Sequence, residues 1–382
     1  MQNIVDKKRE LIGIVNSAIN KAPLPEVKDW EKAFTILKRH SLGSIFYIAV
    51  KDSDKVPKEI KEKAKSHFTA QTAQQMSQDY YTDVIYREFT KRKIKFMPIK
   101  GVTLRDLYPM PEMRTSCDID IFYDYSRKKE VFSFLRELGF EQGIEGGSDT
   151  GFTLGAITLE MHHLLTYGDE TQHKYYKDVW NRLTSDDGVR YNFTAEDFYV
   201  YFLAHSSKHF LNGGFGIRTV LDIYLYRKKV DLNQEYLDAE LEKLSMLKFA
   251  RLIEKLSAAW FEGGEIDEET QFVEEFVLAS ATYGTGKTSV KMREAKLSKS
   301  ARKAKYAYLF NVIFPSYKDM KSRYKILRKL PFLLPFAWVY KWFEVLFTRR
   351  HKFKVVVKSV QDFDKTEFEN TQKIIKITGL RK

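Results

Sequence analysis

The sequence predicts an α+β fold, in which a mixed β-sheet core is flanked by N-terminal and C-terminal helical regions. Two runs with helical spacing of apolar residues come first, one beginning near Trp30 and one spanning 66–91. Three short apolar segments with the length of strands follow at 95–99, 117–123 and 156–162. Helical periodicity resumes from Phe193. A strand-bearing middle between helical regions is typical of an α+β domain.

Four regions are expected along the chain: an N-terminal helical region at 1–93, the sheet core at 94–190, a helical domain at 191–290 and a basic, mainly helical region at 291–382. Within the core we expect, in order, a strand at 95–99, a helix at 101–108, a loop at 109–115, a strand at 117–123, a helix at 126–138 and a strand at 156–162. The glycine-rich segment 143–155 predicts a mobile loop or a hairpin over the site. The Gln-rich polar positions of 66–91 are interpreted as a solvent-exposed helix face.

Two aspartates stand one residue apart in the strand at 117–123. Alternate side chains of a strand share a face, so Asp118 and Asp120 are expected to project together, about 7 Å apart along the backbone. Two such carboxylates repel each other, and a divalent cation removes that cost. Glu160 lies in the apolar segment at 156–162 and, on a neighbouring strand, would complete a three-carboxylate metal site suited to displacement at phosphorus. The alternative is an ordinary half-exposed strand with its polar face in water.

These residues and several others resemble a known family. The motifs are Lys100-Gly101, Tyr108-Pro109, Arg114, Asp118-Ile119-Asp120, Glu160-Met161-His162, Ala204 to His209, and Arg218 to Asp222. Together they resemble the bacterial uncharacterised nucleotidyltransferase family, within the DNA polymerase beta-like nucleotidyltransferase superfamily, over roughly residues 30–345. The resemblance implies a nucleotidyltransferase-type sheet core, three acids that hold Mg²⁺, and a Gly101 that faces the triphosphate of an NTP.

One position departs from the superfamily pattern. The superfamily has Gly-Ser or Gly-Gly at the turn, whereas this chain has Gly101-Val102, so Lys100, Thr103 or Arg105 would have to take over the contact with the terminal phosphates. The nucleotide-binding candidates are Lys100, Gly101, Thr103 and Arg114. Candidates for supporting the metal ligands or contacting substrate are His162, His209, Arg218 and Asp222.

Helical spacing offers plainer explanations for the last group. His205 and His209 stand four residues apart, which allows a zinc pair, but a packed pair on a helix surface is the preferred interpretation because no third ligand is evident. Arg218 and Asp222 have the same spacing and can form a salt bridge within their helix.

Composition narrows the class of protein. The chain has 382 residues and one cysteine, Cys117, so no internal disulfide is expected and a reducing compartment is indicated. Cys117 is interpreted as a small buried residue. The N-terminus has no apolar signal core and no segment has the length of a membrane span. A cytoplasmic protein without a transmembrane segment is therefore expected.

Positive charge is concentrated at the end of the chain. Residues 287–382 contain 25 Lys and Arg against 7 Asp and Glu, a balance of +18, while residues 1–286 carry −5. Such a region predicts an anionic partner, either nucleic acid or an acidic surface, and its alternative is a solvated helical surface. Segment 330–340 is strongly apolar with Lys and Arg on both sides. We expect it to pack against the body of the protein, with contact at a membrane surface as the alternative.

The preferred hypothesis is a nucleotidyltransferase that depends on Mg²⁺, or on Mn²⁺, and moves an NMP from an NTP to an unidentified acceptor hydroxyl or phosphate, releasing pyrophosphate. Asp118, Asp120 and Glu160 would be the metal-binding and catalytic residues, and Lys100 and Arg114 would neutralise charge on the phosphates. The alternative is a non-catalytic nucleotide- or RNA-binding protein on the same fold.

Overall fold

The chain divides into two compact units. The structure, a computed structural model, describes residues 2–99, 101–166, 169–282, 284, 286–297, 300, 303, 307, 310–348 and 365–380. Unit 1 comprises residues 1–206 and 217–271, and unit 2 comprises 207–216 and 272–382. The finer boundaries expected at 93, 190 and 290 stay predictions.

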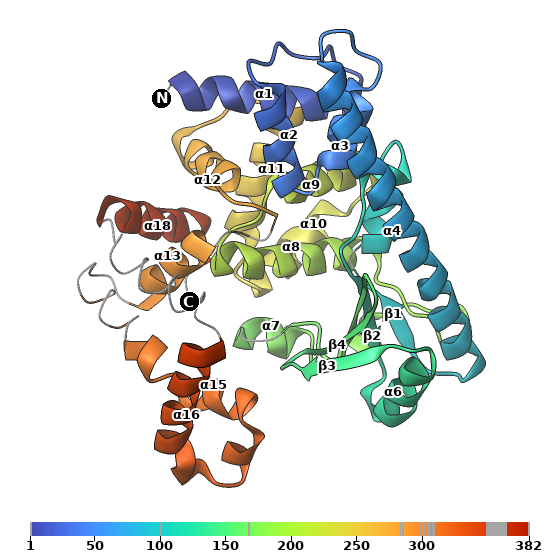
Figure 1. Cartoon of the computed structure of the whole chain (residues 1–382), viewed down its shortest axis with the longest axis vertical. Coiled ribbons are helices and arrows are strands. Elements are labelled where there is room, and N and C mark those ends of the chain that lie inside the picture. The colour runs from blue at the N-terminus through green and yellow to red at the C-terminus, as the bar shows by residue number, and fades with distance from the viewer. Residues whose placement is uncertain are drawn as a thin grey trace. The chain divides into compact units, whose positions relative to one another are not determined.

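Unit 1 combines the sheet with most of the helices (Figure 1). Its helices are α1 (Gln2–Asn20), α2 (Trp30–Arg39), α3 (Gly43–Val50), α4 (Lys58–Lys91), α5 (Gly101–Arg105), α6 (Lys128–Glu137), α7 (Glu170–Tyr175), most of α8 (Ala195–Asn212), α9 (Ile217–Lys229), α10 (Gln234–Lys243) and α11 (Leu247–Phe261). Two predicted helix starts are confirmed. The Asp29 side chain accepts from the backbone N–H of Lys32 before α2, and Thr194 Oγ1 accepts from that of Asp197 at the start of α8.

The sheet has five strands in the order β1-β2-β5-β4-β3. The strands are β1 (Phe96–Pro98), β2 (Ile119–Tyr123), β3 (Glu141–Glu145), β4 (Asp149–Leu154) and β5 (Ile157–His162). Only β2 and β5 pair in parallel, which makes the sheet mixed as predicted. Of the two alternatives for the glycine-rich segment, the structure shows the hairpin, because β3 and β4 pair antiparallel there and extend the sheet.

Side-chain alternation gives the sheet two different faces. Ile119 and Ile121 of β2 pair with Leu159 and Met161 of β5, and all four are buried with residues of α4 and α6 in one core. Figure 1 shows α6 beside the sheet. Because alternate residues of a strand point to opposite faces, Asp120 and the even-numbered residues of β5 project from the face away from this core.

Unit 2 contains α12 (Glu268–Ala279) apart from its first residues, α13 (Gly286–Leu297), α15 (Tyr317–Arg323), α16 (Leu334–Thr348) and α18 (Lys365–Thr378). Helix α18 packs on α13 and buries Phe368, Ile374 and Ile375. Within the described residues, no helix combines the length and the apolar composition needed to cross a membrane.

Candidate functional site

Two carboxylates of the predicted acidic site lie directly opposite each other in the sheet. The parallel register pairs Asp120 of β2 with Glu160 of β5. This confirms the expectation that Glu160 lies on a neighbouring strand. The Asp120 side chain is 6% exposed and that of Glu160 is 35% exposed, so one carboxylate is held in the sheet surface and the other reaches solvent.

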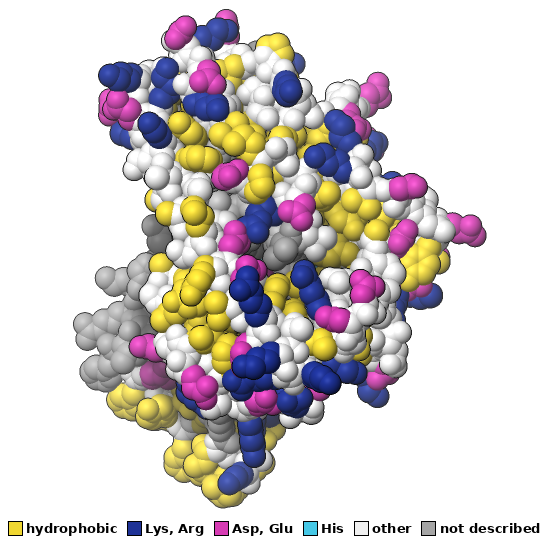
Figure 2. Space-filling model, turned by 90° about the vertical axis from the view of Figure 1, so that its right-hand side faces the viewer, with side chains coloured by type: hydrophobic (Ala, Val, Ile, Leu, Met, Phe, Trp, Pro, Cys, Tyr) yellow, Lys and Arg dark blue, Asp and Glu magenta, His cyan; other side chains and the backbone are white. Residues whose placement is uncertain are grey.

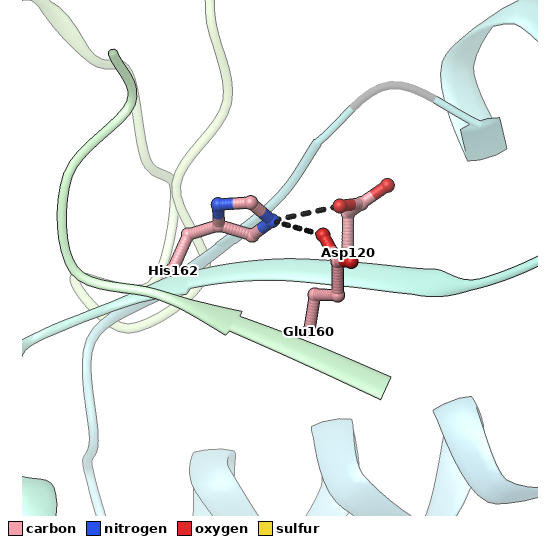
Figure 3. Close-up of side chains that lie close together, drawn as sticks. All are labelled: Asp120, Glu160 and His162. Atoms are coloured by element: carbon pink, nitrogen blue, oxygen red, sulfur yellow. Dashed lines mark hydrogen bonds and ion pairs between the residues drawn. The ribbon is translucent and has the colours of Figure 1, made fainter. Parts of the chain in front are cut away.

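His162 completes this cluster two residues beyond Glu160. Its Nε2 lies 2.7 Å from Asp120 Oδ1 and 3.3 Å from Glu160 Oε2 (Figure 3). A nitrogen that faces two carboxylate oxygens donates to them through its N–H, and Nε2 can bind a cation in the same place only after it has lost that proton. The N–H therefore offsets part of the repulsion between the two acids.

The cluster suits a divalent cation. One oxygen each from Asp120 and Glu160 and one nitrogen of His162 lie within 4.8 Å of one another. Atoms that bind one small divalent ion lie about 2.1 Å from it, hence within about 4.2 Å of each other, so small side-chain movements suffice. Carboxylates suit Mg²⁺ and Mn²⁺, and imidazole suits later divalent metals. The donor set thus fits the predicted cofactor class, with His162 in the position where the sequence suggested Asp118.

Asp118 lies just before β2, and both Asp118 and Asp120 line a cleft. The cleft has an empty volume of about 370 Å³, including the part open to solvent. Its lining residues are Gln75, Gln78, Asp79, Thr82, Tyr86, Ile99, Gly101, Arg105, Ser116, Asp118, Ile119 and Asp120. The two aspartates therefore face a common space, together with the glycine of the predicted turn.

The Gly101 turn approaches the segment before β2 closely. A Cβ at Gly101 would lie 2.5 Å from Ser116 Oγ, which is closer than real Cβ contacts allow. Any larger residue at this position would therefore displace the Ser116 hydroxyl. The approach also brings a serine hydroxyl beside Gly101, although residue 102 is valine.

Polar side chains of α4 hold this segment in place. Gln75 Oε1 accepts from the Ser116 N–H at 2.8 Å, and Gln78 Nε2 donates to the Cys117 carbonyl at 3.2 Å. Thr115 Oγ1 donates to Gln71 Oε1 at 3.2 Å. The interpretation of these glutamines as a solvent-exposed face was wrong, because a row with spacings of four and three residues lies on one side of the helix and faces the chain before β2.

Of the three buried polar atoms of α4 that have no hydrogen-bond partner among the described residues, two belong to residues that line the cleft. They are Oε1 of Gln78, whose residue is 1% exposed, and the hydroxyl of Tyr86. Burial raises the pKa of Tyr86, so its hydroxyl keeps its proton. Both residues line the cleft. Buried polar groups are normally hydrogen-bonded, so these atoms are suited to contact a bound molecule or water.

A buried network joins α9 to the same segment. Arg114 Nε and Nη2 donate to the two carboxylate oxygens of Asp222 at 2.8 and 3.1 Å, and the Tyr108 hydroxyl donates to Asp222 Oδ1 at 2.7 Å. Burial, and next the charge of Asp222, raise the pKa of Tyr108. Arg218 Nη1 donates to the Thr115 carbonyl at 3.1 Å. Four residues of the motifs that carry the family resemblance, Tyr108, Arg114, Arg218 and Asp222, thus lie together around the segment that leads into β2.

The remaining predicted residues lie as follows. Thr103 is exposed on α5, and Arg105 pairs with Asp79 of α4 at 2.8 Å. Lys100 lies outside the described residues. His209 belongs to unit 2, so its predicted role at this site stays a prediction. Cys117 is exposed, which corrects the expectation that it is buried, because its backbone carbonyl rather than its side chain is directed to α4.

Sequence comparison independently identifies the chain. Comparison with curated proteins and with solved structures gives no match. The model of one family, described as uncharacterised nucleotidyltransferase, matches residues 26–262. The matched range is more than half of the chain and contains the acidic cluster, the Gly101 turn and the Arg114–Asp222 pair. The chain therefore belongs to the uncharacterised nucleotidyltransferase family.

Proposed function

We propose that this chain transfers a nucleoside monophosphate from an NTP to a hydroxyl or phosphate acceptor, with Mg²⁺ or Mn²⁺ bound at the acidic cluster. An acceptor oxygen would form a bond to the α-phosphorus while the bond to the bridging oxygen breaks, and pyrophosphate would leave. The observation that carries the proposal is the parallel pairing that sets Asp120 beside Glu160, next to a cleft shared with Asp118 and Gly101.

Each residue has a role that follows from its place. Asp120, Glu160 and Asp118 would hold the ion, and His162 would orient Asp120 or join it as a ligand. A bound divalent ion supplies positive charge to the phosphate oxygens and lowers the pKa of an attacking hydroxyl. Gly101 leaves room for a phosphate, and Lys100 and Thr103 are the proposed phosphate contacts. Arg114, which the sequence suggested for the same role, would instead hold the segment before β2 through its two hydrogen bonds to Asp222.

Two further elements belong to this proposal. The polar atoms of Gln78 and Tyr86 would contact the part of the substrate that enters the cleft. The reaction would take place in the cytoplasm, where NTP is available. The basic C-terminal region would bind an anionic partner.

Calorimetric titration tests the metal-dependent binding. NTP is titrated into the full-length protein with and without Mg²⁺ or Mn²⁺, and then into Asp118→Asn combined with Asp120→Asn. The proposal predicts that the double variant loses metal-dependent binding and keeps its fold. Asp52→Asn combined with Asp54→Asn is the matched control, because both residues are exposed, have the same spacing as Asp118 and Asp120, and are not among the residues that line the cleft. Equal NTP affinity in the two double variants would end the proposal.

Pyrophosphate release then separates transfer from binding alone. An acceptor screen with labelled NTP should give pyrophosphate together with a labelled product, and both should disappear in Glu160→Gln. Metal-dependent NTP binding with no pyrophosphate for any acceptor would favour the non-catalytic alternative.

A further inference from the structure

Exposed apolar side chains gather in one part of unit 2. Of the fifteen large hydrophobic side chains exposed in the described residues, nine lie between 310 and 343. The most exposed are Phe332 and Phe336, both at 71%, followed by Phe310 and Tyr340, both at 62%. The lower end of Figure 2, where Figure 1 places α16, shows hydrophobic side chains beside Lys and Arg. We call the seven of these side chains that lie between 326 and 343, together with Arg328 and Lys329, the α16 surface.

The outward face of α16 is regular. Phe336, Val339, Tyr340 and Phe343 are 71%, 43%, 62% and 58% exposed and follow a spacing of three, four and seven residues. Such residues lie on one side of a helix. Phe332 stands one turn earlier, in the short 3₁₀ segment Pro331–Leu333. The helix therefore presents a continuous apolar stripe.

The opposite face of α16 is fixed to the chain before α15. Trp338 Nε1 donates to the Pro315 carbonyl at 3.0 Å, and Trp342 Nε1 donates to the Ile313 carbonyl at 2.7 Å. Lys341 Nζ donates to the Val312 carbonyl at 2.6 Å. These bonds set the rotation of the helix, so the outward direction of the stripe is built into the fold.

Two exposed basic residues stand beside this stripe in a segment rich in Lys and Arg. Residues 310–348 contain seven Lys and Arg and two Asp and Glu. Arg328 and Lys329 are exposed directly before Leu330. One of the two acids, Glu344, accepts from Arg323 at 2.6 Å and from the Tyr324 hydroxyl at 2.8 Å. Positive charge therefore faces solvent beside the apolar stripe.

We propose that the α16 surface binds an anionic lipid membrane, with α16 lying in the interface and the basic residues at the headgroups. An apolar helix face bordered by Lys and Arg is the pattern of helices that bind in this way. No described helix is long and apolar enough to cross a membrane, so the binding is peripheral. This inference stands apart from the proposed function and does not rest on it.

Two other partners fit the observations less well. Single-stranded nucleic acid binds by stacking of bases on flat rings, whereas three of the seven apolar residues of the α16 surface, Ile326, Leu330 and Val339, are aliphatic and offer no ring. A second copy of the chain would bring two sets of positive charges together, which repel.

Vesicle co-sedimentation of the full-length protein tests the proposal. The vesicles are phosphatidylcholine alone, or phosphatidylcholine with about one third phosphatidylserine, the anionic lipid of the cytoplasmic leaflet. We expect binding to the anionic vesicles, much weaker binding to the neutral ones, and loss of most binding in about 1 M salt, where the Debye length is about 3 Å.

Variants assign the binding to the surface. Phe332→Ser with Phe336→Ser should reduce partitioning to anionic vesicles by roughly a hundredfold, because two aromatic side chains no longer enter the interface. Arg328→Gln with Lys329→Gln should reduce it by roughly tenfold and weaken its salt dependence. The matched control is Ile144→Ser with Met76→Ser, which removes side chains that are 86% and 68% exposed elsewhere. Near-ultraviolet circular dichroism from Trp338 and Trp342 checks that the fold is kept.

Three outcomes would overturn the proposal. The first is no binding to anionic vesicles, and the second is binding that the Phe332 and Phe336 variant leaves unchanged. In the third, the natural chain does not bind vesicles but binds a single-stranded oligonucleotide or forms a concentration-dependent dimer. The Phe332 and Phe336 variant then loses that oligonucleotide binding or that dimer.

Discussion

Removing the charge of Asp222 should destabilise unit 1 strongly. In Asp222→Asn the Arg114 guanidinium, whose side chain is 7% exposed, loses its carboxylate partner, and Tyr108 loses a charged acceptor. Breaking a buried ion pair by removing one partner costs about 3–5 kcal/mol, because a buried charge is left uncompensated. In a unit of this size that lowers Tm by roughly 6–20 °C. Thermal and chemical unfolding of the single variant measure both quantities.

A double variant separates the effect of the two charges on stability from the effect of the volume that the two side chains fill. Arg114→Met combined with Asp222→Leu replaces both charged groups by apolar ones, and such replacements of buried pairs are often neutral or stabilising. We expect its stability to return to within about 1–3 kcal/mol of the natural chain, because the buried Tyr108 hydroxyl still lacks its acceptor. The two single losses are then strongly non-additive. A single-variant loss below about 1 kcal/mol, as for exposed pairs, would refute the description of this network as buried and tightly coupled.

The same variants decide what Arg114 does for nucleotide. If its guanidinium only holds the segment that leads into β2, the double variant binds NTP as well as the natural chain. If it contacts phosphate, stability returns but NTP affinity does not. The bidentate contact with Asp222 leads us to expect recovery of most of the affinity, measured by calorimetry in Mg²⁺.

Three further predictions concern the cleft and the ion. Gly101→Ala should weaken NTP binding by at least about tenfold, because its Cβ would lie 2.5 Å from Ser116 Oγ. Adding Ser116→Gly to this variant should restore part of the affinity. Unchanged NTP binding in Gly101→Ala alone would contradict a close phosphate contact at the turn. Tyr86→Phe should leave thermal stability equal or higher but lower substrate affinity about two- to tenfold, by loss of one hydrogen bond; unchanged affinity would show that its hydroxyl does not touch substrate. In the absence of nucleotide, His162→Gln should weaken Mn²⁺ binding by roughly 10–100-fold, as measured by electron paramagnetic resonance. Asp118→Asn should weaken it less. The opposite order would place Asp118 closer to the ion than His162.

Local patterns were sufficient to predict three of the five strands and the acidic residues of the sheet, and they left the β3–β4 segment as a loop or a hairpin. Short apolar segments of strand length located β1, β2 and β5, and the third acid was expected on a neighbouring strand. The direct pairing of Asp120 with Glu160 agrees with that expectation. Helix starts with a capping Asp or Thr were also predictable, because a cap depends only on residues three apart.

Long-range contacts of polar residues could not be predicted in the same way. Gln75 and Gln78 are ordinary residues of a solvated helix unless another segment covers them, and the covering segment lies about 40 residues later in the chain. Asp222 has a helical neighbour at the right spacing in Arg218, yet its partner is Arg114, 108 residues away. Sequence spacing predicts ion pairs within a helix, but it does not show whether a charged residue from a distant part of the chain lies closer.

The two aspartates of the acidic motif are held by different parts of the fold. Strand β2 begins at Ile119, so Asp120 is fixed by its pairing with β5, while Asp118 belongs to the preceding segment. That segment is held by Gln75 and Gln78 of α4 and by Arg218 of α9. Substitutions in these helices therefore act on the site through Asp118 and the cleft and leave the Asp120–Glu160 pair intact. The candidate site therefore depends on α4 and α9 as well as on the sheet.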